Sequence, residues 1–456
     1  MQLSESSSST EITRRLFDLA WPIIGLNVLQ VLALAVDTAM VGHTPNSEFA
    51  LTGMGYGSQL IFLLMVAMIG LTVGTVAFIA RAKGAGQTER SQNILHQSVQ
   101  MTLMLGVVMA VVGNILAEPL LKLLGADQNT LTPALAYLRP LLWGTGFNYL
   151  NILFAASLRG VGNTRLAFMV ALGMNALNFL FNYALILGNF GFEPMGIAGA
   201  AVGTVMAQAC AVITMATILS RNVVPGLGLS LRPRTVDGPL VKELIRVGWP
   251  AAADMLVLNA AFLSIIGMLG RIDQAAVGAH SLGLRVQALA FVPGMSISQA
   301  VGAMVGQALG AHNVASAKKI LRSGIGLNLI IMSSLGLVLI AFSHFLVGVF
   351  GVDPTSSLHT FSVQWMRLLG YSMPVVGVYI AVVGLFQGSG ATRLSLRINL
   401  VSTVLVQIPA SYVLGFTFGL GPWGVWAAFP GVFLLKLAWA SVEYRRGNWA
   451  KTGAQV

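Results

Sequence analysis

The chain contains few charged residues and almost no cysteine. Only 9% of its 456 residues are charged and 56% are hydrophobic, whereas about 25% of the residues in a soluble domain are charged. This composition excludes an ordinary soluble protein and predicts one that crosses a membrane several times. A disulfide within the chain is excluded because Cys210 is its single cysteine, and we expect this residue to be a packing residue.

Several motifs of enzymes and nucleotide-binding proteins are also missing. No G-x-x-x-x-G-K-[ST] loop occurs, which disfavours ATP as an energy source within this chain. GVGNTR (Gly160–Arg165) contains G-x-G but follows no predicted strand, so we expect no dinucleotide site there. Neither a Cys/His metal spacing nor a Ser/His/Asp order stands out. We therefore expect neither an enzyme nor a bound cofactor.

What the chain does contain is about twelve apolar runs, each of a length suited to a membrane-spanning helix. The expected spans are Leu16–Val41, Leu51–Ala80, Val99–Ala117, Pro133–Leu158, Leu166–Leu187, Gly196–Leu219, Leu244–Leu269, Ala275–Gln307, Gly324–Phe342, Val363–Phe386, Leu394–Phe416 and Gly421–Val442. The polar first residues lead straight into the first span, so we expect no cleaved signal peptide.

Arginine and lysine are distributed unequally between the loops. They precede the first span, follow every even-numbered span and end the chain, at Arg14, Arg15, Arg81, Lys83, Arg90, Arg159, Arg165, Arg221, Arg232, Arg234, Lys242, Arg246, Lys318, Lys319, Arg322, Arg393, Arg397, Arg445, Arg446 and Lys451. Because basic loops stay in the cytoplasm, both termini are expected inside. The net charge of +11 is then a topology signal, and we expect no nucleic-acid partner.

The sequence repeats itself at a fixed distance. LFDLAWPIIG (Leu16–Gly25) resembles LIRVGWPAAA (Leu244–Ala253), and RGVGNTRLAF (Arg159–Phe168) resembles QGSGATRLSL (Gln387–Leu396). Both pairs are offset by 228 residues, as are GIAGAAVG from Gly196 and GVWAAFPG from Gly424. We therefore predict an all-α polytopic protein with twelve transmembrane helices in two parallel six-helix repeats.

The repeat and the basic loops together predict the domain boundaries. The expected parts are a cytoplasmic N-terminal tail (residues 1–15), an N-lobe (16–220), a cytoplasmic linker (221–242), a C-lobe (243–443) and a cytoplasmic C-terminal tail (444–456). Two homologous halves are typical of a transporter whose lobes rock around a central site.

Asp37 is the carboxylate within the first expected span. A charge at membrane depth costs roughly 2.5–3.5 kcal/mol on insertion scales, so such residues are usually functional. Asn27 and Gln30 share its helix face, and Pro22, which lacks a backbone N–H, is a candidate hinge. The alternative is that Asp37 only holds two helices together.

The halves, the WP pairs (Trp21–Pro22, Trp249–Pro250), VDTAMVGH in the first span and RGVGNTR after the fourth resemble the MATE (multidrug and toxin extrusion) family. NFLFNYALILG followed by GIAGAAVGTV adds to this, and the acid near the end of the first span is similar to the DinF-like branch. The resemblance implies an antiporter in a bacterial inner (cytoplasmic) membrane. It would export organic cations, drugs and amphipathic compounds in exchange for H⁺ or Na⁺.

By matching positions, the resemblance also implies a cation-coupling site in the N-lobe at Asp37, Asn178 and Thr204. Asn182 stands where the family pattern typically has a second acid, which leaves one carboxylate there and weakens a Na⁺ site. Other branches use a glutamate in the seventh span, and Asp254 in that span is a candidate second acidic site.

The residues support this cluster independently. Asn175, Asn178 and Asn182 form a polar stripe on one helix face, at the same expected depth as Asp37 and Thr204. The alternative is ordinary hydrogen bonding between helices, worth about 0.6 kcal/mol per pair. For Asp254 the alternative is a structural pair with a buried cation or histidine, and the sequence offers His280, Arg285 and Arg367.

We expect protonation of Asp37 to rearrange its bonds to Asn178, Asn182 and Thr204 and to bend the first helix at Pro22, so that the N-lobe cavity collapses. The expected partners are small-molecule drugs and membrane lipid, with the protein acting as a monomer. A flippase for lipids or lipid-linked oligosaccharides is the alternative function. It would need a large cationic groove, whereas the spans offer Arg285 and Arg367 as intramembrane cations.

Overall fold

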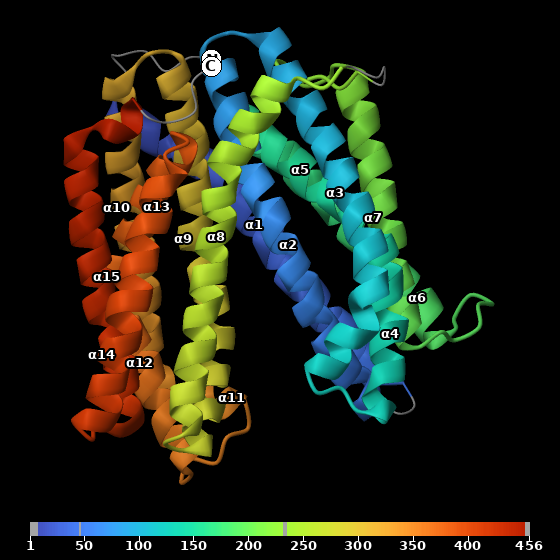
Figure 1. The fold of residues 1–456 in the computed structure, drawn as a ribbon, viewed down its shortest axis with the longest axis vertical. Helices are drawn as coiled ribbons and strands as arrows, with labels where there is room; N and C mark the ends of the chain where they lie inside the picture. The colour runs from blue at the N-terminus through green and yellow to red at the C-terminus, as the bar shows by residue number, and fades with distance from the viewer. Residues whose placement is uncertain (1–7, 45–46, 231–234, 452–456) are drawn as a thin grey trace. The chain divides into compact units, whose positions relative to one another are not determined.

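The structure is a computed structural model that describes residues 8–44, 47–230 and 235–451 (Figure 1). Arg232 and Arg234 of the expected linker, and the outer parts of both expected tails, lie outside the described residues. The described residues form helices and no strand. Eleven of these helices are long and apolar enough to cross a membrane. The predicted all-α membrane fold is confirmed.

Contacts divide the chain into two compact units. The N-terminal unit is Gly25–Ile245, and the C-terminal unit combines Met1–Ile24 with Arg246–Val456. The boundary therefore falls within the first helix, α1 (Ser9–Gly42), and not at its start. The physical reason is packing, because Ile12, Leu16 and Ala20 lie in the hydrophobic core of the C-terminal unit.

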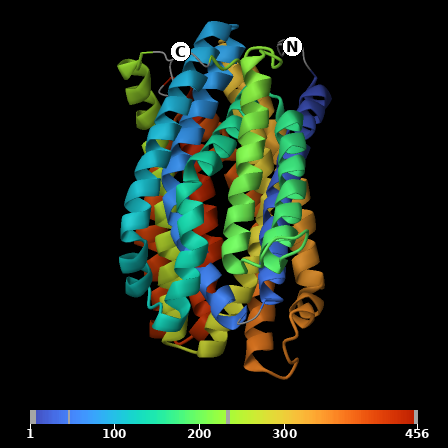
Figure 2. The same cartoon turned by 90° about the vertical axis from the view of Figure 1, so that its right-hand side faces the viewer.

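The N-terminal unit contains the later part of α1 and six further helices. These are α2 (Ser47–Gly84), α3 (Thr88–Leu123), α4 (Gln128–Trp143), α5 (Thr145–Val161), α6 (Thr164–Leu187) and α7 (Ile197–Ser220). Figure 2 faces this unit and shows the helices from α3 to α7 running alongside one another. Helices α6 and α7 pack together, and α2 packs against α3, α4 and α5.

The expected span Pro133–Leu158 is divided in the structure. It forms α4 and α5, which meet at Gly144. Pro140 contributes no backbone N–H to this region, and a Cβ at Gly144 would lie 2.3 Å from Val205 Cγ2. At the break the chain thus comes close to α7, and the helix there is weakened by the missing N–H of Pro140.

The C-terminal unit begins within α8 (Gly238–Gly270) and continues with the helices of the second repeat. These are α9 (Gln274–Gly310), α10 (Val314–Ala341), α11 (Ser343–Val349), α12 (Ser357–Gly388), α13 (Thr392–Leu400), α14 (Ile408–Tyr412), α15 (Gly421–Arg446) and a 3₁₀ turn at Asn448–Ala450. Two π-helical stretches, Val401–Gln407 and Val413–Thr417, flank α14. Pro409 lies between them, where a missing N–H favours wider turns.

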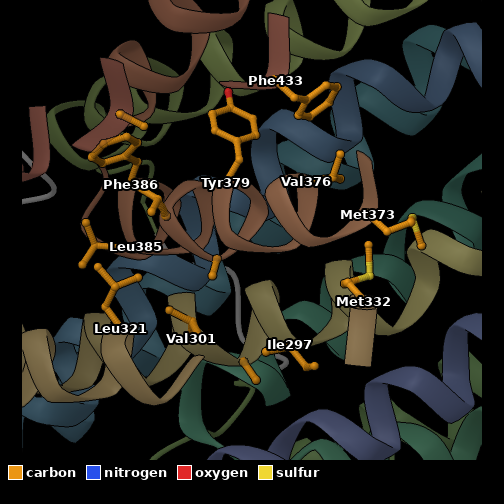
Figure 3. Packing of buried hydrophobic residues seen from close by; sticks show 14 of the residues in the cluster. Ile297, Val301, Leu321, Met332, Met373, Val376, Tyr379, Leu385, Phe386 and Phe433 are labelled. Carbon is orange, nitrogen blue, oxygen red and sulfur yellow. The ribbon is translucent and has the colours of Figure 1, made fainter. Parts of the chain in front are cut away.

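Close contacts between small residues build the core of this unit. A Cβ at Gly388 of α12 would lie 2.0 Å from the carbonyl oxygen of Gly302 in α9, so the two backbones touch. Larger side chains fill the space around this contact. Figure 3 shows Met332 of α10 next to Met373 of α12. A tightly packed core holds the polar groups of the unit at fixed positions.

Candidate functional site

Helix α1 belongs to both units, and the change occurs beside Pro22. The unit boundary lies between Ile24 and Gly25, two residues after this proline. On the N-terminal side of the boundary Ile23 packs into the C-terminal unit. On the other side a Cβ at Gly25 would lie 2.5 Å from the ring of Phe168 in α6, so α1 touches that helix closely. Pro22 therefore lies two residues before the boundary of the units, and its role as a hinge stays a prediction.

Asp37 lies in the part of α1 that belongs to the N-terminal unit. It is five residues before the end of the helix, and only 8% of it is exposed. Asn182 of α6 donates a hydrogen bond from Nδ2 to Asp37 Oδ1 at 2.6 Å. Asn182 is completely buried, so the amide and the carboxylate share an enclosed polar site.

Two more predicted residues continue this network. The Nδ2 of Asn182 lies 3.4 Å from Asn178 Oδ1, and Asn178 Nδ2 donates to Thr204 Oγ1 of α7 at 3.1 Å. Thr204 in turn donates to the carbonyl oxygen of Ala200 at 2.8 Å. The structure thus joins Asp37, Asn178, Asn182 and Thr204 in one chain of hydrogen bonds. Their role in coupling stays a prediction.

The third asparagine of the predicted stripe is not part of this chain. Asn175 donates from Nδ2 to the carbonyl oxygen of Ala171, in its own helix, at 2.7 Å. It lies one turn before Asn178, farther from the end of α6 near which the carboxylate lies. Of the three asparagines on this helix face, Asn182 bonds directly to the acid and Asn178 is connected to it through Asn182.

A glycine on α7 makes room for Asn182. A Cβ at Gly203 would lie 2.2 Å from Asn182 Oδ1. Within the described part of the chain, this oxygen has no hydrogen-bond partner although it is buried. A buried acceptor without a donor is costly. The site therefore retains hydrogen-bonding capacity next to the carboxylate.

The composition of this network decides what it can bind. Asp37 contributes a carboxylate that can hold and release a proton, and Asn178, Asn182 and Thr204 contribute neutral oxygen atoms. Oxygen atoms of this kind are also the ligands that hard cations such as Na⁺ prefer. With one carboxylate, the network fits one proton or one monovalent cation.

The structure also places Asp254, the predicted second acidic residue, in a polar network. It lies at the middle of α8 and is 7% exposed. Asn399 of α13 donates to its Oδ1 at 2.8 Å, and Ser395 donates to its Oδ2 at 3.0 Å. The hydroxyl of Tyr379 in α12 donates to Asn399 Oδ1 at 2.8 Å.

The candidate partners named for Asp254 from the sequence were wrong. Arg285 is exposed. Arg367 bonds to Ser343 Oγ and His344 Nε2, and in α12 it lies well before Tyr379, which belongs to the network of Asp254. His280 lies among aromatic rings, 5.2 Å from that of Trp365 between centroids. Helical direction explains the error, because spacing along one helix does not reveal which neighbouring helix a side chain faces.

Lys436 of α15 is the cation that sequence reasoning overlooked. It is 1% exposed, and its Nζ lies 4.9 Å from the ring centroid of Phe433, which packs edge-on against Tyr379. Its signal was present, since FLLKLAW (Phe433–Trp439) places a single lysine in an apolar run. The set of intramembrane cations therefore includes Lys436 as well as Arg285 and Arg367.

Comparisons with known proteins match both halves of the chain. A family model described as MatE matches residues 22–184 and 250–413, one match in each half. The chain is 28% identical to the probable multidrug resistance protein NorM of Thermotoga maritima, over 97% of this chain and 94% of that protein. It is 26% identical to the probable multidrug resistance protein YoeA of Bacillus subtilis, over 95% and 94% of the two chains.

Solved structures share the fold over almost the whole chain. A structure described as MATE in the bent conformation has a TM-score of 0.87 at 21% identity and covers 99% of this chain and 100% of its own. Another, described as MATE in the straight conformation, has a TM-score of 0.86 at 22% identity, with 97% of both chains covered.

Proposed function

Since the chain belongs to the MatE family of transporters, as its sequence motifs had suggested, we propose that it exports drugs and other toxic organic cations in exchange for protons. The names of the NorM and YoeA relatives support multidrug resistance as the physiological role. The membrane-spanning helices make it a multi-pass membrane protein. The proposed location is a bacterial inner membrane, with both termini in the cytoplasm.

The observation that carries this proposal is the buried network around Asp37. An ionised Asp37 accepts the hydrogen bond from Asn182 Nδ2. A protonated Asp37 becomes a donor, and the neighbouring Asn182 Oδ1 is an acceptor without a partner. Protonation therefore favours a rotated Asn182 amide, which exchanges the positions of its oxygen and nitrogen atoms.

This rotation of the Asn182 amide would also change hydrogen bonds that do not involve the carboxylate. The same Nδ2 of Asn182 also contacts Asn178 Oδ1, and Asn178 bonds to Thr204 on α7. A change in the charge of Asp37 thus alters bonds between α1, α6 and α7. The outer part of α1 can then bend at Pro22 while the first turns of the helix stay packed in the C-terminal unit.

Protons are proposed rather than Na⁺ because the network holds one carboxylate. Asn182 occupies the place of a second acid and supplies no further negative charge. One proton per transport cycle supplies useful energy, since one charge moved through 100 mV is worth about 2.3 kcal/mol. Alternating access between the two lobes would convert that energy into export.

Efflux from proteoliposomes tests the proposal directly. A fluorescent organic cation is loaded, and a pH gradient or a Na⁺ gradient is imposed separately on wild type, Asp37→Asn and Glu118→Gln. Glu118 is a matched control because it is an exposed acid of the same unit, paired with Lys122 at 2.7 Å. We expect the pH gradient to drive efflux in wild type and Glu118→Gln but not in Asp37→Asn.

Three results would count against this proposal. Wild-type rates in Asp37→Asn would show that the carboxylate does not couple transport. Efflux driven only by the Na⁺ gradient would identify the other coupling ion. Movement of labelled phospholipid in place of the organic cation would favour the flippase alternative.

A further inference from the structure

Two loops, one in each unit, carry closely similar apolar sequences. Residues 190–196, between α6 and α7, read FGFEPMG, and residues 418–424, which lead into α15, read FGLGPWG. The two segments are offset by 228 residues, the distance that relates the two halves. Figure 1 shows the first segment extending away from the ends of α6 and α7. We call these two segments the aromatic loops.

The large apolar side chains of the aromatic loops are exposed. Phe190 is 71% exposed and its counterpart Phe418 is 69% exposed, so the repeat preserves the exposure as well as the residue. Two further pairs of exposed apolar residues stand at equivalent positions, namely Phe192 with Leu420 and Met195 with Trp423. Clustered apolar side chains that remain exposed in both halves indicate contact with a partner that is itself apolar, such as a membrane.

Backbone hydrogen bonds hold the first aromatic loop in a defined shape. The N–H of Asn189 donates to the carbonyl oxygen of Ala184 at 3.1 Å, and that of Met195 donates to the carbonyl oxygen of Leu185 at 2.8 Å. Both ends of the loop are thus tied to α6. Phe190 has a φ of +59°, in the left-handed region that bulky residues rarely adopt. An exposed phenyl ring held in a disfavoured backbone conformation indicates a use for the ring outside the protein.

The second aromatic loop is an ordered turn as well. The N–H of Phe418 donates to the carbonyl oxygen of Val413, in the preceding π-helical stretch, at 2.9 Å. Gly419, with a φ of +69°, turns the chain after this residue, just as Gly191, with a φ of +85°, does in the first loop. The left-handed region is open to glycine because it has no Cβ. The exposure of the apolar side chains therefore comes from two defined turns.

Exposed rings connect each aromatic loop to the preceding membrane-spanning segment. Phe179 and Tyr183, both exposed on α6, stack 6.5 Å apart, and Tyr183 meets Phe190 edge-on at 5.9 Å. In the other unit Tyr412 of α14 stacks on Phe416 at 4.8 Å, directly before the second loop. Both preceding segments are apolar enough to cross a membrane. Each row of rings thus ends where aromatic residues are typical of membrane proteins, at the interface between lipid and water.

Charge distinguishes the aromatic loops from the opposite ends of the same helices. The two loops contain one charged residue, Glu193. In contrast, Arg165 lies at the start of α6, and Arg445 and Arg446 lie at the end of α15. Basic residues are what attracts a protein surface to anionic lipid headgroups. Contact between the aromatic loops and a membrane would therefore be apolar rather than electrostatic.

We propose that the aromatic loops are two membrane anchors, one on each unit. They insert their exposed apolar side chains into the phospholipid bilayer where the headgroups meet the acyl chains. The inserted residues are Phe190, Phe192, Phe418, Leu420 and Trp423. Each unit then has one helix end fixed at a defined depth in the membrane. This inference rests on the membrane-spanning helices and is independent of the coupling ion and the exported compound.

The depth of labels on the full-length protein tests the anchors. A fluorophore is attached to Phe192→Cys or Leu420→Cys in a Cys210→Ser background, and the protein is reconstituted into vesicles of phosphatidylethanolamine and phosphatidylglycerol. Iodide, present on both sides of the membrane, measures contact with water. Lipids that carry a nitroxide either at the headgroup or at the end of the acyl chain measure depth. We expect the headgroup nitroxide to quench both loop labels most strongly.

Two reference positions define the scale of the measurement. Val236→Cys lies at an exposed position of the linker and reports contact with water. Ile213→Cys lies at an exposed position of the membrane-spanning α7 and reports contact with hydrocarbon. We expect iodide to quench the loop labels no more than about half as strongly as the label at position 236. The acyl-chain nitroxide should quench them less than the label at position 213.

Substitution of the neighbouring ring tests whether it holds the loop in place. With the label at position 192, Phe190→Ser should raise iodide quenching about twofold, because a polar side chain gains nothing from the interface. Phe190→Trp is the matched control and should leave the quenching unchanged. Phe418→Ser and Phe418→Trp form the same pair for the label at position 420. Both rings are exposed, so these variants should fold.

Four results would overturn the proposal. Iodide quenching as strong as at position 236 would place a loop in water. Acyl-chain quenching as strong as at position 213 would place it in hydrocarbon. Labels protected from iodide and from both nitroxides would show that protein, such as a second copy of the chain, covers the loops. Equal iodide quenching in the serine and tryptophan variants would show that the rings do not anchor them.

Discussion

Asp37 in the N-terminal unit and Asp254 in the C-terminal unit are both buried acids, but their neighbours differ. Asp37 lies near the end of α1 with two asparagines and a threonine nearby, while Asp254 lies at the middle of α8 and accepts hydrogen bonds from Ser395 and Asn399. The residues bonded around each acid are neutral, but the C-terminal unit also buries the ammonium group of Lys436. Protonation of either acid therefore changes the local charge, but the groups that surround the two acids differ.

The comparison also separates scaffold from chemistry. The repeat offset places Ile265 at the position of Asp37 and Leu26 at that of Asp254. The two halves thus share helices, glycines and prolines, but neither acid has an acidic counterpart. The two halves therefore share a framework, and each has its own polar site.

The largest difference between the units is expected in proton-driven efflux. Asp37→Asn should reduce it to the level of protein-free vesicles, because the N-terminal network then has no titratable group. Asp254→Asn/Lys436→Met removes a buried acid and a buried cation of the other unit and should retain most of the signal. Efflux of a fluorescent cation under a pH gradient measures both variants. Faster efflux in Asp37→Asn than in Asp254→Asn/Lys436→Met would contradict the comparison.

Stability should depend more on Asp254 than on Asp37, the reverse of the order expected for efflux. Asp254→Asn or Lys436→Met alone leaves an opposite buried charge of the unit uncompensated, a change that typically costs about 3–5 kcal/mol. The double variant should recover much of that loss, whereas Asp37→Asn should change stability far less. Thermal unfolding of purified variants tests this, and single variants as stable as wild type would contradict it.

A pair of equivalent glycines sharpens the comparison further. Gly203→Ala brings a methyl group to about 2.2 Å from Asn182 Oδ1, while nothing lies within 4 Å of a Cβ at Gly431, its counterpart in the other half. Overpacking of this kind costs roughly 1–3 kcal/mol. We expect Gly203→Ala to slow efflux about tenfold and Gly431→Ala to have little effect. Equal rates in the two variants would show that the spacing around Asn182 is unimportant.

The smallest effect is expected for the two prolines. Pro22→Ala restores a backbone N–H beside the boundary of the units and should stiffen α1, which we expect to slow efflux about threefold. Pro250→Ala, the equivalent change in α8, provides the control and should have less effect. Initial efflux rates at matched protein amounts compare the two variants. A larger loss of rate in Pro250→Ala would indicate that the hinge lies in α8.

Much of the fold followed from the sequence because a bilayer imposes a simple rule on it. Apolar runs of sufficient length become helices, and the repeat at 228 residues predicted two similar halves. The break at Gly144 was not predicted, since it depends on how closely α7 approaches that point. The assignment of the first turns of α1 to the C-terminal unit likewise depends on packing between distant segments.

The candidate sites show the same division. Composition, the asparagine spacing and the family resemblance by themselves determined that Asp37, Asn178, Asn182 and Thr204 are the polar residues at one depth of the N-terminal half. Only the tertiary structure decided that Asn175 stays apart, that Ser395 and Asn399 bond to Asp254, and that Lys436 is a buried cation of that unit. The physical reason is that helical periodicity fixes which residues share a face, whereas the rotation and neighbours of each helix are set by side-chain packing across the whole unit.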